Sequence, residues 1–227
     1  MSSRRYNRVL LKLSGNCFEQ EDLLDRIIRQ IAAARRAGVR FGIVMGGGNI
    51  LRGRDSAGSD RAASDKAGML ATVINGLRLA ELLGRRLPVV HLSAVGIPGT
   101  VASYDIWRAR AELERGAVLV LSGGTGNPFF STDSAAALRA AELEMDVLLK
   151  GTRVAGVYSA DPEKDPAAKR YRRISYEAAL AAKLNVMDLT AFALLMDRRI
   201  PVVVFDVGRP GAITDILKGK RIGSLIC

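Results

Sequence analysis

The sequence contains few of the residues that most often carry metal or nucleophilic chemistry. Its 227 residues include one histidine, His91, and two cysteines, Cys17 and Cys227. One histidine with two distant cysteines excludes a dedicated zinc site, and cysteines at opposite ends of a chain form no disulfide framework. No serine–histidine–carboxylate arrangement is indicated. His91 lies within a strand pattern, where we expect a structural role, and we expect Cys17 to be an idle thiol.

Long apolar runs and targeting segments are also missing. No run approaches the roughly 20 residues that a membrane-spanning helix needs. The first fifteen residues, MSSRRYNRVLLKLSG, contain no long apolar segment before a small-residue cleavage site, so no secretory signal is indicated. No linker, low-complexity segment or internal repeat divides the chain. We therefore expect a soluble cytoplasmic protein, without membrane contact, whose residues 1–227 form a single domain.

Positive charge is in excess, because 34 lysines and arginines face 23 aspartates and glutamates, a net charge of +11. Such an excess attracts anions of any kind. The basic residues are scattered, however, and the densest cluster, Lys169–Arg173, has no recognisable nucleic-acid-binding motif beside it. We interpret that cluster mainly as solvated surface, with contact to a polyanion or partner as the alternative. We do not expect nucleic-acid binding as the main function.

Apolar segments alternate with helical patterns along nearly the whole chain. Strands are predicted at Arg8–Leu13, Val39–Met45, Leu87–Leu92, Ala117–Ser122, Met145–Lys150 and Ile200–Phe205. Helices are predicted around Leu23–Ile31 and at Leu70–Leu83, Tyr104–Arg115 and Ser134–Leu143. The strand segments are almost continuously apolar, as in strands covered on both faces. This order predicts an α/β fold with a mainly parallel sheet and helices on both faces.

Unusual loops follow four of the predicted strands. They are KLSG from Lys12, GGGNILRG from Gly46, GGTGNPFFSTD from Gly123 and KGTRVAGVYSADP from Lys150. Ligands of parallel sheets bind outside the carboxyl ends of the strands, so these loops should share one site. The Walker pattern GxxxxGK[ST] and the dinucleotide fingerprint GxGxxG are both missing, so the site should differ from the standard nucleotide sites.

Two cations in these loops are suited to phosphate. Lys12 lies near the end of a predicted buried strand and can reach a phosphate as a point charge, and Arg52 can bind one bidentately. The glycines from Gly46 to Gly48 can direct backbone N–H groups at an anion, or simply form a flexible turn. For Lys12 taken alone, an ordinary surface position remains the alternative.

The loop that enters the helix at Ser134 combines polar and aromatic residues. Thr132 and Asp133 either cap that helix or form a helix start that faces a phosphate, with Asp133 holding a nearby lysine. Phe129 and Phe130 either belong to the core or form a wall for a flat ring. Taken together, the loops favour a small anionic ligand that carries a ring.

The motifs together resemble the bacterial-type UMP kinases (uridylate kinases) of the amino acid kinase superfamily. The resemblance rests on LLKLSG, GGGNILRG, DKAGMLATVINGL, GGTGNPFFSTDSAAALRAAEL, DVLLKGTRVAGVYSADPEKDPAAKRY, LNVMDLTAFAL and VGRPGAI. They occur in the family's order from about Arg8 to Ile226, and thus cover nearly the whole chain. The resemblance implies a three-layer α/β/α sandwich on a mainly parallel sheet, commonly assembled as a homohexamer.

The resemblance also implies roles for individual residues. The ATP-binding residues would be Lys12, Leu13, Ser14, Gly15, Gly48, Arg52, Thr152, Tyr158 and Asp161. The UMP-binding residues would be Gly47, Asp65 (for the ribose), Thr125, Gly126, Asn127, Pro128, Phe129, Phe130, Ser131 and Thr132. Lys12 and Arg52 would act in catalysis together with Asp133, which would orient the catalytic lysine. No residue is implied as a metal ligand.

The implied reaction is transfer of a phosphoryl group from ATP to UMP, with Mg²⁺ bound through the ATP phosphates. The phosphate of UMP has a second pKa near 6, so it is already a nucleophilic dianion at neutral pH, and no general base is needed. The chemistry then consists of positioning and charge stabilisation. Two alternatives stay open: a related kinase with another small acceptor, and a nucleotide sensor or nucleic-acid-binding protein without catalysis.

Some positions depart from the family pattern. Asn16 replaces a glutamate usual after KLSG, the loop that follows is short, and Ala80 and Ala117 stand where GTP-responsive members have arginines, although Trp107 matches. These departures argue against activation by GTP and leave inhibition by UTP open. Gly151 and Ala155 also differ from the commoner alanine and aspartate, which could adjust nucleotide affinity.

Overall fold

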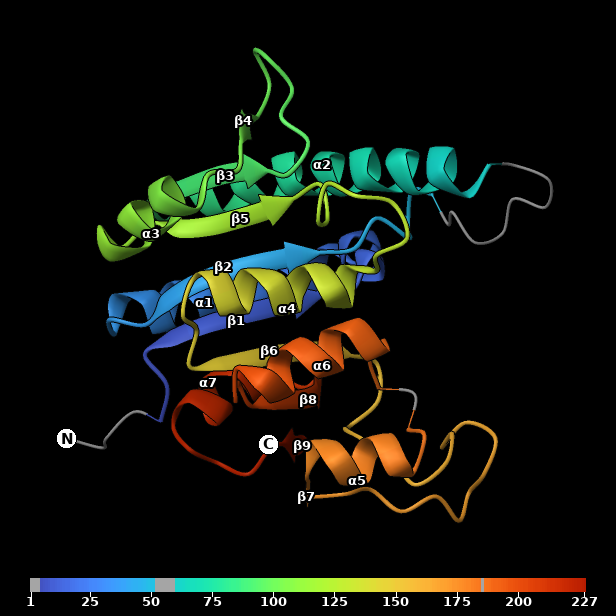
Figure 1. Cartoon of the computed structure of the whole chain (residues 1–227). Helices are drawn as coiled ribbons and strands as arrows, with labels where there is room; N and C mark the ends of the chain where they lie inside the picture. The colour runs from blue at the N-terminus through green and yellow to red at the C-terminus, as the bar shows by residue number, and fades with distance from the viewer. Residues whose placement is uncertain (1–4, 52–59, 185) are drawn as a thin grey trace.

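The central feature of the fold is one large, mainly parallel sheet. The computed structural model describes residues 5–51, 60–184 and 186–227, and within these residues nine strands join in the order β4-β3-β5-β2-β1-β6-β8-β9-β7 (Figure 1). Their bounds are β1 Arg8–Leu13, β2 Arg40–Met45, β3 Val89–Ser93, β4 Ala102–Ser103, β5 Val118–Ser122, β6 Val147–Thr152, β7 Arg173–Ile174, β8 Val202–Asp206 and β9 Ser224–Ile226. All pairs are parallel except β8 with β9. The predicted mainly parallel sheet is confirmed.

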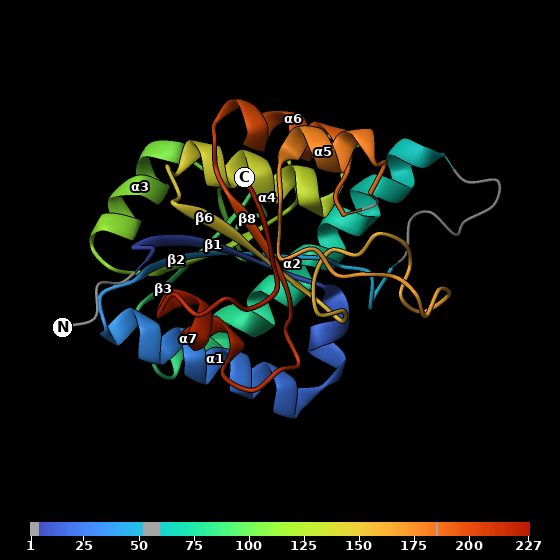
Figure 2. The same cartoon turned by 90° about the horizontal axis from the view of Figure 1, so that it is seen from below.

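Helices cover both faces of this sheet, as Figure 2 shows. On one face lie α1 (Glu21–Arg36), α7 (Ala212–Leu217), the short 3-10 helix η1 (Gly15–Glu19) and the carboxyl-terminal half of α2 (Arg61–Gly84). On the other face lie α3 (Ile106–Glu114), α4 (Thr132–Glu142), α5 (Tyr176–Ala181) and α6 (Leu189–Asp197). Each face buries its own apolar cluster, so the architecture is the expected three-layer α/β/α sandwich.

The six predicted strands are all present, with ends that differ by at most two residues. The short elements β4, β7, β9, α5, α6 and α7 were not predicted. Five of them have only two to six residues, and α6, which is apolar at most of its nine positions, shows little alternation between apolar and polar faces. Helix α2 begins at Arg61 rather than at Leu70. Its first turns are polar, and the side chain of Asp60 caps them by accepting a hydrogen bond from the N–H of Ala62. Because these first turns lack periodic apolar residues, the apolar pattern did not predict them as helical.

Helix α2 is also the one described helix that is long and apolar enough to span a membrane, by length and composition alone. It packs against β2, β3 and β5, and Leu79 and Leu83 on its inner side are completely buried. We therefore identify it as a core helix of a soluble protein.

Candidate active site

Two lysines lie side by side at the carboxyl ends of the central strands. In β1, Leu10 packs on the face covered by α4, and Lys12, two residues further, lies on that same face. Strand β6 pairs with β1 so that Lys150 lies directly opposite Lys12. Parallel neighbours in register point their side chains to the same face, which brings the two ammonium groups together.

Asp133 lies between the two ammonium groups. Its Oδ1 is 2.9 Å from Lys12 Nζ and its Oδ2 is 2.6 Å from Lys150 Nζ. The three side chains are at most 15% exposed. Lys150 also donates a hydrogen bond to the carbonyl oxygen of Val186. The trio therefore holds a net positive charge in a largely dry position, where charge acts most strongly.

Burial and mutual attraction set the protonation of this trio. Burial acts to raise the pKa of Asp133, but the nearby ammonium groups of Lys12 and Lys150 outweigh burial and hold the pKa below its ordinary value. Burial lowers the pKa of Lys150, and Asp133 offsets this only in part. Asp133 is consequently ionised at neutral pH, and its lowered pKa makes it a weak base.

The start of α4 places Asp133. The cap of this helix is Ser131, whose Oγ accepts hydrogen bonds from the N–H groups of Asp133 (2.9 Å) and Ser134 (3.2 Å). Capping by Thr132 or Asp133, which the sequence left open, is therefore wrong, and the carboxylate of Asp133 is available to the lysines. Asp188 accepts hydrogen bonds from the hydroxyls of Ser131 and Ser134 and caps α6 through the N–H of Ala191. It thus joins the starts of α4 and α6.

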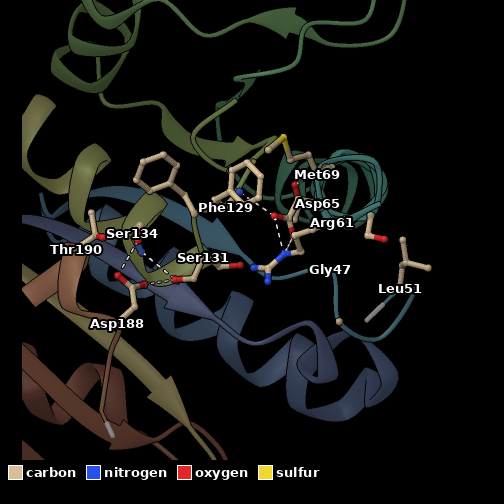
Figure 3. A pocket seen from close by; sticks show the side chains of 17 residues that line it. Gly47, Leu51, Arg61, Asp65, Met69, Phe129, Ser131, Ser134, Asp188 and Thr190 are labelled. Atoms are coloured by element: carbon tan, nitrogen blue, oxygen red, sulfur yellow. Dashed lines mark hydrogen bonds and ion pairs between the residues drawn. The ribbon is translucent and has the colours of Figure 1, made fainter. Parts of the chain in front are cut away.

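A cavity of about 520 Å³ opens beside α4, as Figure 3 shows. Six of the predicted UMP-binding residues line it: Gly47, Asp65, Phe129, Phe130, Ser131 and Thr132. Gly48, predicted for ATP, lines it too. The volume lies in the range typical of small-molecule sites. We call it the acceptor cavity.

The four remaining predicted UMP residues do not line the acceptor cavity. Thr125, Gly126, Asn127 and Pro128 form the outer turn of the β5–α4 loop, in which the hydroxyl of Thr125 bonds with the backbone of Asn127. Their contact with a ligand stays a prediction.

Helix α2 holds this loop over the cavity. Asp65 Oδ2 accepts a hydrogen bond of 2.8 Å from the N–H of Phe129 and lies 3.0 Å from Arg61 Nε (Figure 3). Lys66 donates to the carbonyl oxygen of Gly126 at 3.0 Å. These contacts fix the aromatic residues of the loop relative to Asp65.

Phe129 has an unusual backbone for its size. Its φ is 71°, in the left-handed region that a bulky residue rarely adopts, and its side chain is 68% exposed although it lines the acceptor cavity. A strained conformation held by a specific hydrogen bond is a frequent property of ligand-binding segments. Of the two sequence interpretations, core residue or ring wall, the exposure of Phe129 and Phe130 (47%) favours the wall.

The glycine loop after β2 is held close to both β1 and α2. A Cβ at Gly47 would lie 2.8 Å from Ala71 Cβ, and one at Gly15 would lie 2.4 Å from Asn49 Oδ1, so neither position admits a side chain. Asn75 donates to Asn49 and to the carbonyl oxygen of Gly46, both at 2.8 Å. A Cβ at Gly48, in contrast, would meet no described protein atom within 4 Å.

A second cavity of about 520 Å³ lies beyond Lys150, and we call it the donor cavity. Three predicted ATP-binding residues, Thr152, Tyr158 and Asp161, line it together with Lys150 itself. The hydroxyl of Thr152 donates to the backbone near the strand end, and Asp161 Oδ1 accepts the N–H of Glu163 at 3.0 Å. Lys150 therefore borders the donor cavity while its partner Asp133 belongs to the helix that borders the acceptor cavity.

Of the remaining predicted ATP-binding residues, those that the structure describes lie at the end of β1 or directly after it. The side chain of Leu13 is buried in the core, so only its backbone can contact a ligand. Ser14 caps η1 by accepting a hydrogen bond from the N–H of Asn16, and Gly15 is buried against the glycine loop. Arg52 lies outside the described residues, so its predicted role stays untested.

Three residues of the site were missed by the sequence analysis. Lys150 was placed at the end of a strand and at the start of one of the site loops but was given no role, although a lysine in an otherwise apolar strand was the same signal that singled out Lys12. Asp188 and Arg61 carry no signal of their own, because their roles depend on contacts with distant segments. His91 lies in β3, within the strand where we expected it, with Nε2 2.8 Å from Ser122 Oγ. It lines neither cavity, and burial lowers its pKa to about 4.

Comparisons with known proteins agree with this geometry. The model of the amino acid kinase family matches residues 7–206. The uridylate kinase of Marinobacter nauticus is 48% identical over 98% of this chain and 96% of its own length, and that of Pseudomonas aeruginosa is 46% identical over 98% and 95%. The solved UMP kinase of Bacillus anthracis superposes with a TM-score of 0.93 at 33% identity, over 97% of this chain and 96% of its own. That of Ureaplasma parvum gives 0.90 at 36% identity, over 98% and 99%.

The fold and the cationic site between two cavities are those of a small-molecule kinase. The chain belongs to the amino acid kinase family, and within that family its near relatives at full length are uridylate kinases. The resemblance that the sequence motifs carried is thereby confirmed.

Proposed function

We propose that this protein transfers the terminal phosphoryl group of ATP to UMP, giving ADP and UDP, by in-line displacement without a general base. The observation that carries the proposal is the trio of Lys12, Asp133 and Lys150. Lys150 lines the donor cavity, and Asp133 lies between Thr132 and Ser134, which line the acceptor cavity. A phosphoryl transferase must bring two polyanions together, and a net positive charge fixed between two binding cavities suits that task.

The acceptor cavity suits a nucleoside monophosphate. Asp65 offers a carboxylate to ribose hydroxyls, and the exposed rings of Phe129 and Phe130 offer a wall to a flat base. An acidic amino acid would gain nothing from an additional carboxylate in its site. The donor cavity, with Thr152, Tyr158 and Asp161, then receives ATP.

The reaction consists of one substitution at phosphorus. A phosphate oxygen of UMP bonds to the γ-phosphorus of ATP while the bond from that phosphorus to the β–γ bridging oxygen breaks, and ADP leaves. Lys12 and Lys150 neutralise the charge that is shared among these oxygens. Asp133 is a positioning residue, because it touches the lysines rather than the reacting atoms.

No side chain has to remove a proton. The phosphate of UMP is a dianion above its second pKa of about 6. The rate should therefore fall as the pH is lowered through that value, even though Asp133, with its lowered pKa, stays ionised.

Mg²⁺ enters through the nucleotide rather than through the protein. The described residues contain no group of three or more histidine, cysteine, aspartate or glutamate side chains that could hold a metal ion, and Asp133 is already neutralised by two lysines. Mg²⁺ commonly binds substrate phosphates and keeps several waters, so ATP phosphates would supply its ligands. When bound, it neutralises part of the phosphate charge.

We also propose that the protein acts in the cytoplasm as a homohexamer. An apolar stripe on α2 supports self-association: Leu70, Ile74 and Leu77 are 45%, 55% and 39% exposed at helical spacing. Light scattering on the purified protein tests this part, and a monomer at micromolar concentration would contradict it.

The decisive experiment is a coupled assay of ADP formation with a panel of acceptors: UMP, CMP, dTMP, aspartate and glutamate. We expect turnover with UMP to exceed that with every other acceptor. Equal or faster turnover with another acceptor would refute the assignment of UMP, and specific ligand binding without any turnover would favour a sensor.

A further inference from the structure

A second concentration of positive charge lies outside the linings of the two cavities. A depression of about 660 Å³, which we call the basic pocket, is lined by residues 5, 6, 170, 172, 173, 220–223 and 225, together with Val203 and Ile216. Arg5 and Tyr6 come just before the first residue of β1, whereas Lys12 lies near its last (Figure 1). The basic pocket thus reaches the amino end of β1, and on its other side Arg170 pairs with Tyr158, which lines the donor cavity.

Six cationic side chains and no carboxylate line this pocket: Arg5, Arg170, Arg172, Arg173, Lys220 and Arg221. Lys220 pairs with Asp215 at 2.8 Å, but none of the five arginines forms a salt bridge with any residue that the structure describes. Arginines elsewhere are mostly paired, as Arg8 and Arg40 are with Glu114. Uncompensated like charges repel one another, and a bound anion would relieve that repulsion.

The side-chain contacts of these arginines are with neutral groups. The guanidinium of Arg5 lies 5.2 Å from the ring centre of Tyr6, and Arg170 donates to the carbonyl oxygen of Ala155 at 3.3 Å. Arg173 Nε lies 3.2 Å from Cys227 Sγ. Because a guanidinium carries five N–H donors, these contacts leave most donors available to a ligand.

The floor of the pocket is part of the core. Tyr6, Val203 and Ile216 are at most 7% exposed, and Ile222 and Leu225 are partly buried beside them. The hollow is therefore formed before any ligand arrives, which lowers the entropic cost of binding.

We propose that the basic pocket binds a polyphosphate anion of the size of a nucleotide triphosphate chain. Guanidinium groups bind phosphate oxygens bidentately, and several of them converge here from three separate segments. A duplex nucleic acid would instead favour a basic stripe along an extended surface, whereas these side chains surround a single depression. The site accounts for part of the +11 charge that the active site does not use.

Calorimetric titration of the full-length protein with inorganic tripolyphosphate tests the proposal. UMP and a non-hydrolysable ATP analogue with Mg²⁺ are kept saturating, so that the catalytic cavities are filled. The test variant is R172Q/R221Q, and the matched control is R36Q/R108Q, which removes the same charge from exposed arginines that lie outside the pocket and form no described salt bridge. Turnover of UMP is measured for each protein and should be unchanged in both.

We expect saturable binding that R172Q/R221Q weakens by about tenfold or more, because charge-assisted hydrogen bonds are lost. The control should change it by less than about twofold, as screened surface charges do. Equal weakening in both variants, or no saturable binding to the parent, would overturn the proposal. So would an oligonucleotide that protects the pocket and is not displaced by tripolyphosphate.

A second series of titrations identifies the source of the phosphate chain. Four nucleoside triphosphates that differ in their base are compared with tripolyphosphate. Equal affinities would show that the phosphate chain is the whole ligand, and tighter binding of one nucleotide would show that its base contacts the apolar floor.

Discussion

Replacing Asp133 with asparagine removes the negative charge between two buried lysines. The two ammonium groups, 2.9 and 2.6 Å from the carboxylate in the parent, would then face each other without it. Removing one partner of a buried ion pair typically costs about 3–5 kcal/mol of folding free energy. At about 2–4 °C per kcal/mol for a chain of this size, Asp133→Asn should lower Tm by roughly 6–20 °C, as measured by circular dichroism.

The loss of stability in Asp133→Asn should become smaller as the pH rises. Burial already lowers the pKa of Lys150, and loss of the carboxylate should lower it further. The unfolded chain then binds a proton that the folded variant has released, so the stability of the variant rises with pH between the folded pKa and the unfolded value of about 10.4. The difference in Tm between Asp133→Asn and the parent should therefore shrink as the pH is raised from neutral.

Kinetics give an independent measurement on the same variant. If Asp133 positions the lysines, kcat should fall by about 10² or more, while the KM for UMP changes little. The control is Asp197→Asn, whose exposed partner Arg198 lies 3.4 Å away, and it should stay within about 0.5 kcal/mol of the parent. A variant at Asp133 with the parental Tm at every pH and the parental kcat would refute the role of this carboxylate.

Three further substitutions separate the roles of the site residues. Lys12→Ala should lower kcat by about 10²–10³, and Lys12→Arg should restore little of it. The Tm of Lys12→Ala should stay close to that of the parent, because Lys150 still neutralises Asp133. If Lys12→Ala kept more than about a third of the parental kcat, catalysis by Lys12 would be disproved. Lys150→Met should lower kcat to a similar extent. Two unit charges about 4 Å apart at an effective dielectric constant of 20 attract each other by about 4 kcal/mol, and the variant loses this attraction between the ammonium group and the transferring phosphate. An unchanged kcat would restrict Lys150 to a structural role. Asp65→Asn should raise the KM for UMP by about tenfold to a hundredfold with little effect on kcat, because a charged hydrogen bond to the ribose contributes about 1.5–3 kcal/mol. An unchanged KM would contradict ribose binding.

Much of the fold could be predicted because buried parallel strands leave a strong signal. All six apolar segments became strands, and the loops after β2, β5 and β6 line the two cavities. The loop after β1 packs against the β2 loop through Gly15. The short strand β9 runs antiparallel to β8, and three residues carry too little pattern to reveal it. The start of α2 was missed because the residues around Asp65 are polar where they line the acceptor cavity.

The sequence by itself determined the layered α/β class, the loops that carry the site, and the family, because these depend on local pattern and on motifs in a fixed order. Only the tertiary structure decided that Lys150 lies beside Lys12, since the register of β6 on β1 joins segments far apart in the chain. It also decided that Ser131 rather than Asp133 caps α4, because the choice depends on Asp133 having two buried ammonium groups as partners. A charged side chain acquires its role from the charges folded against it, and those neighbours are not adjacent in sequence.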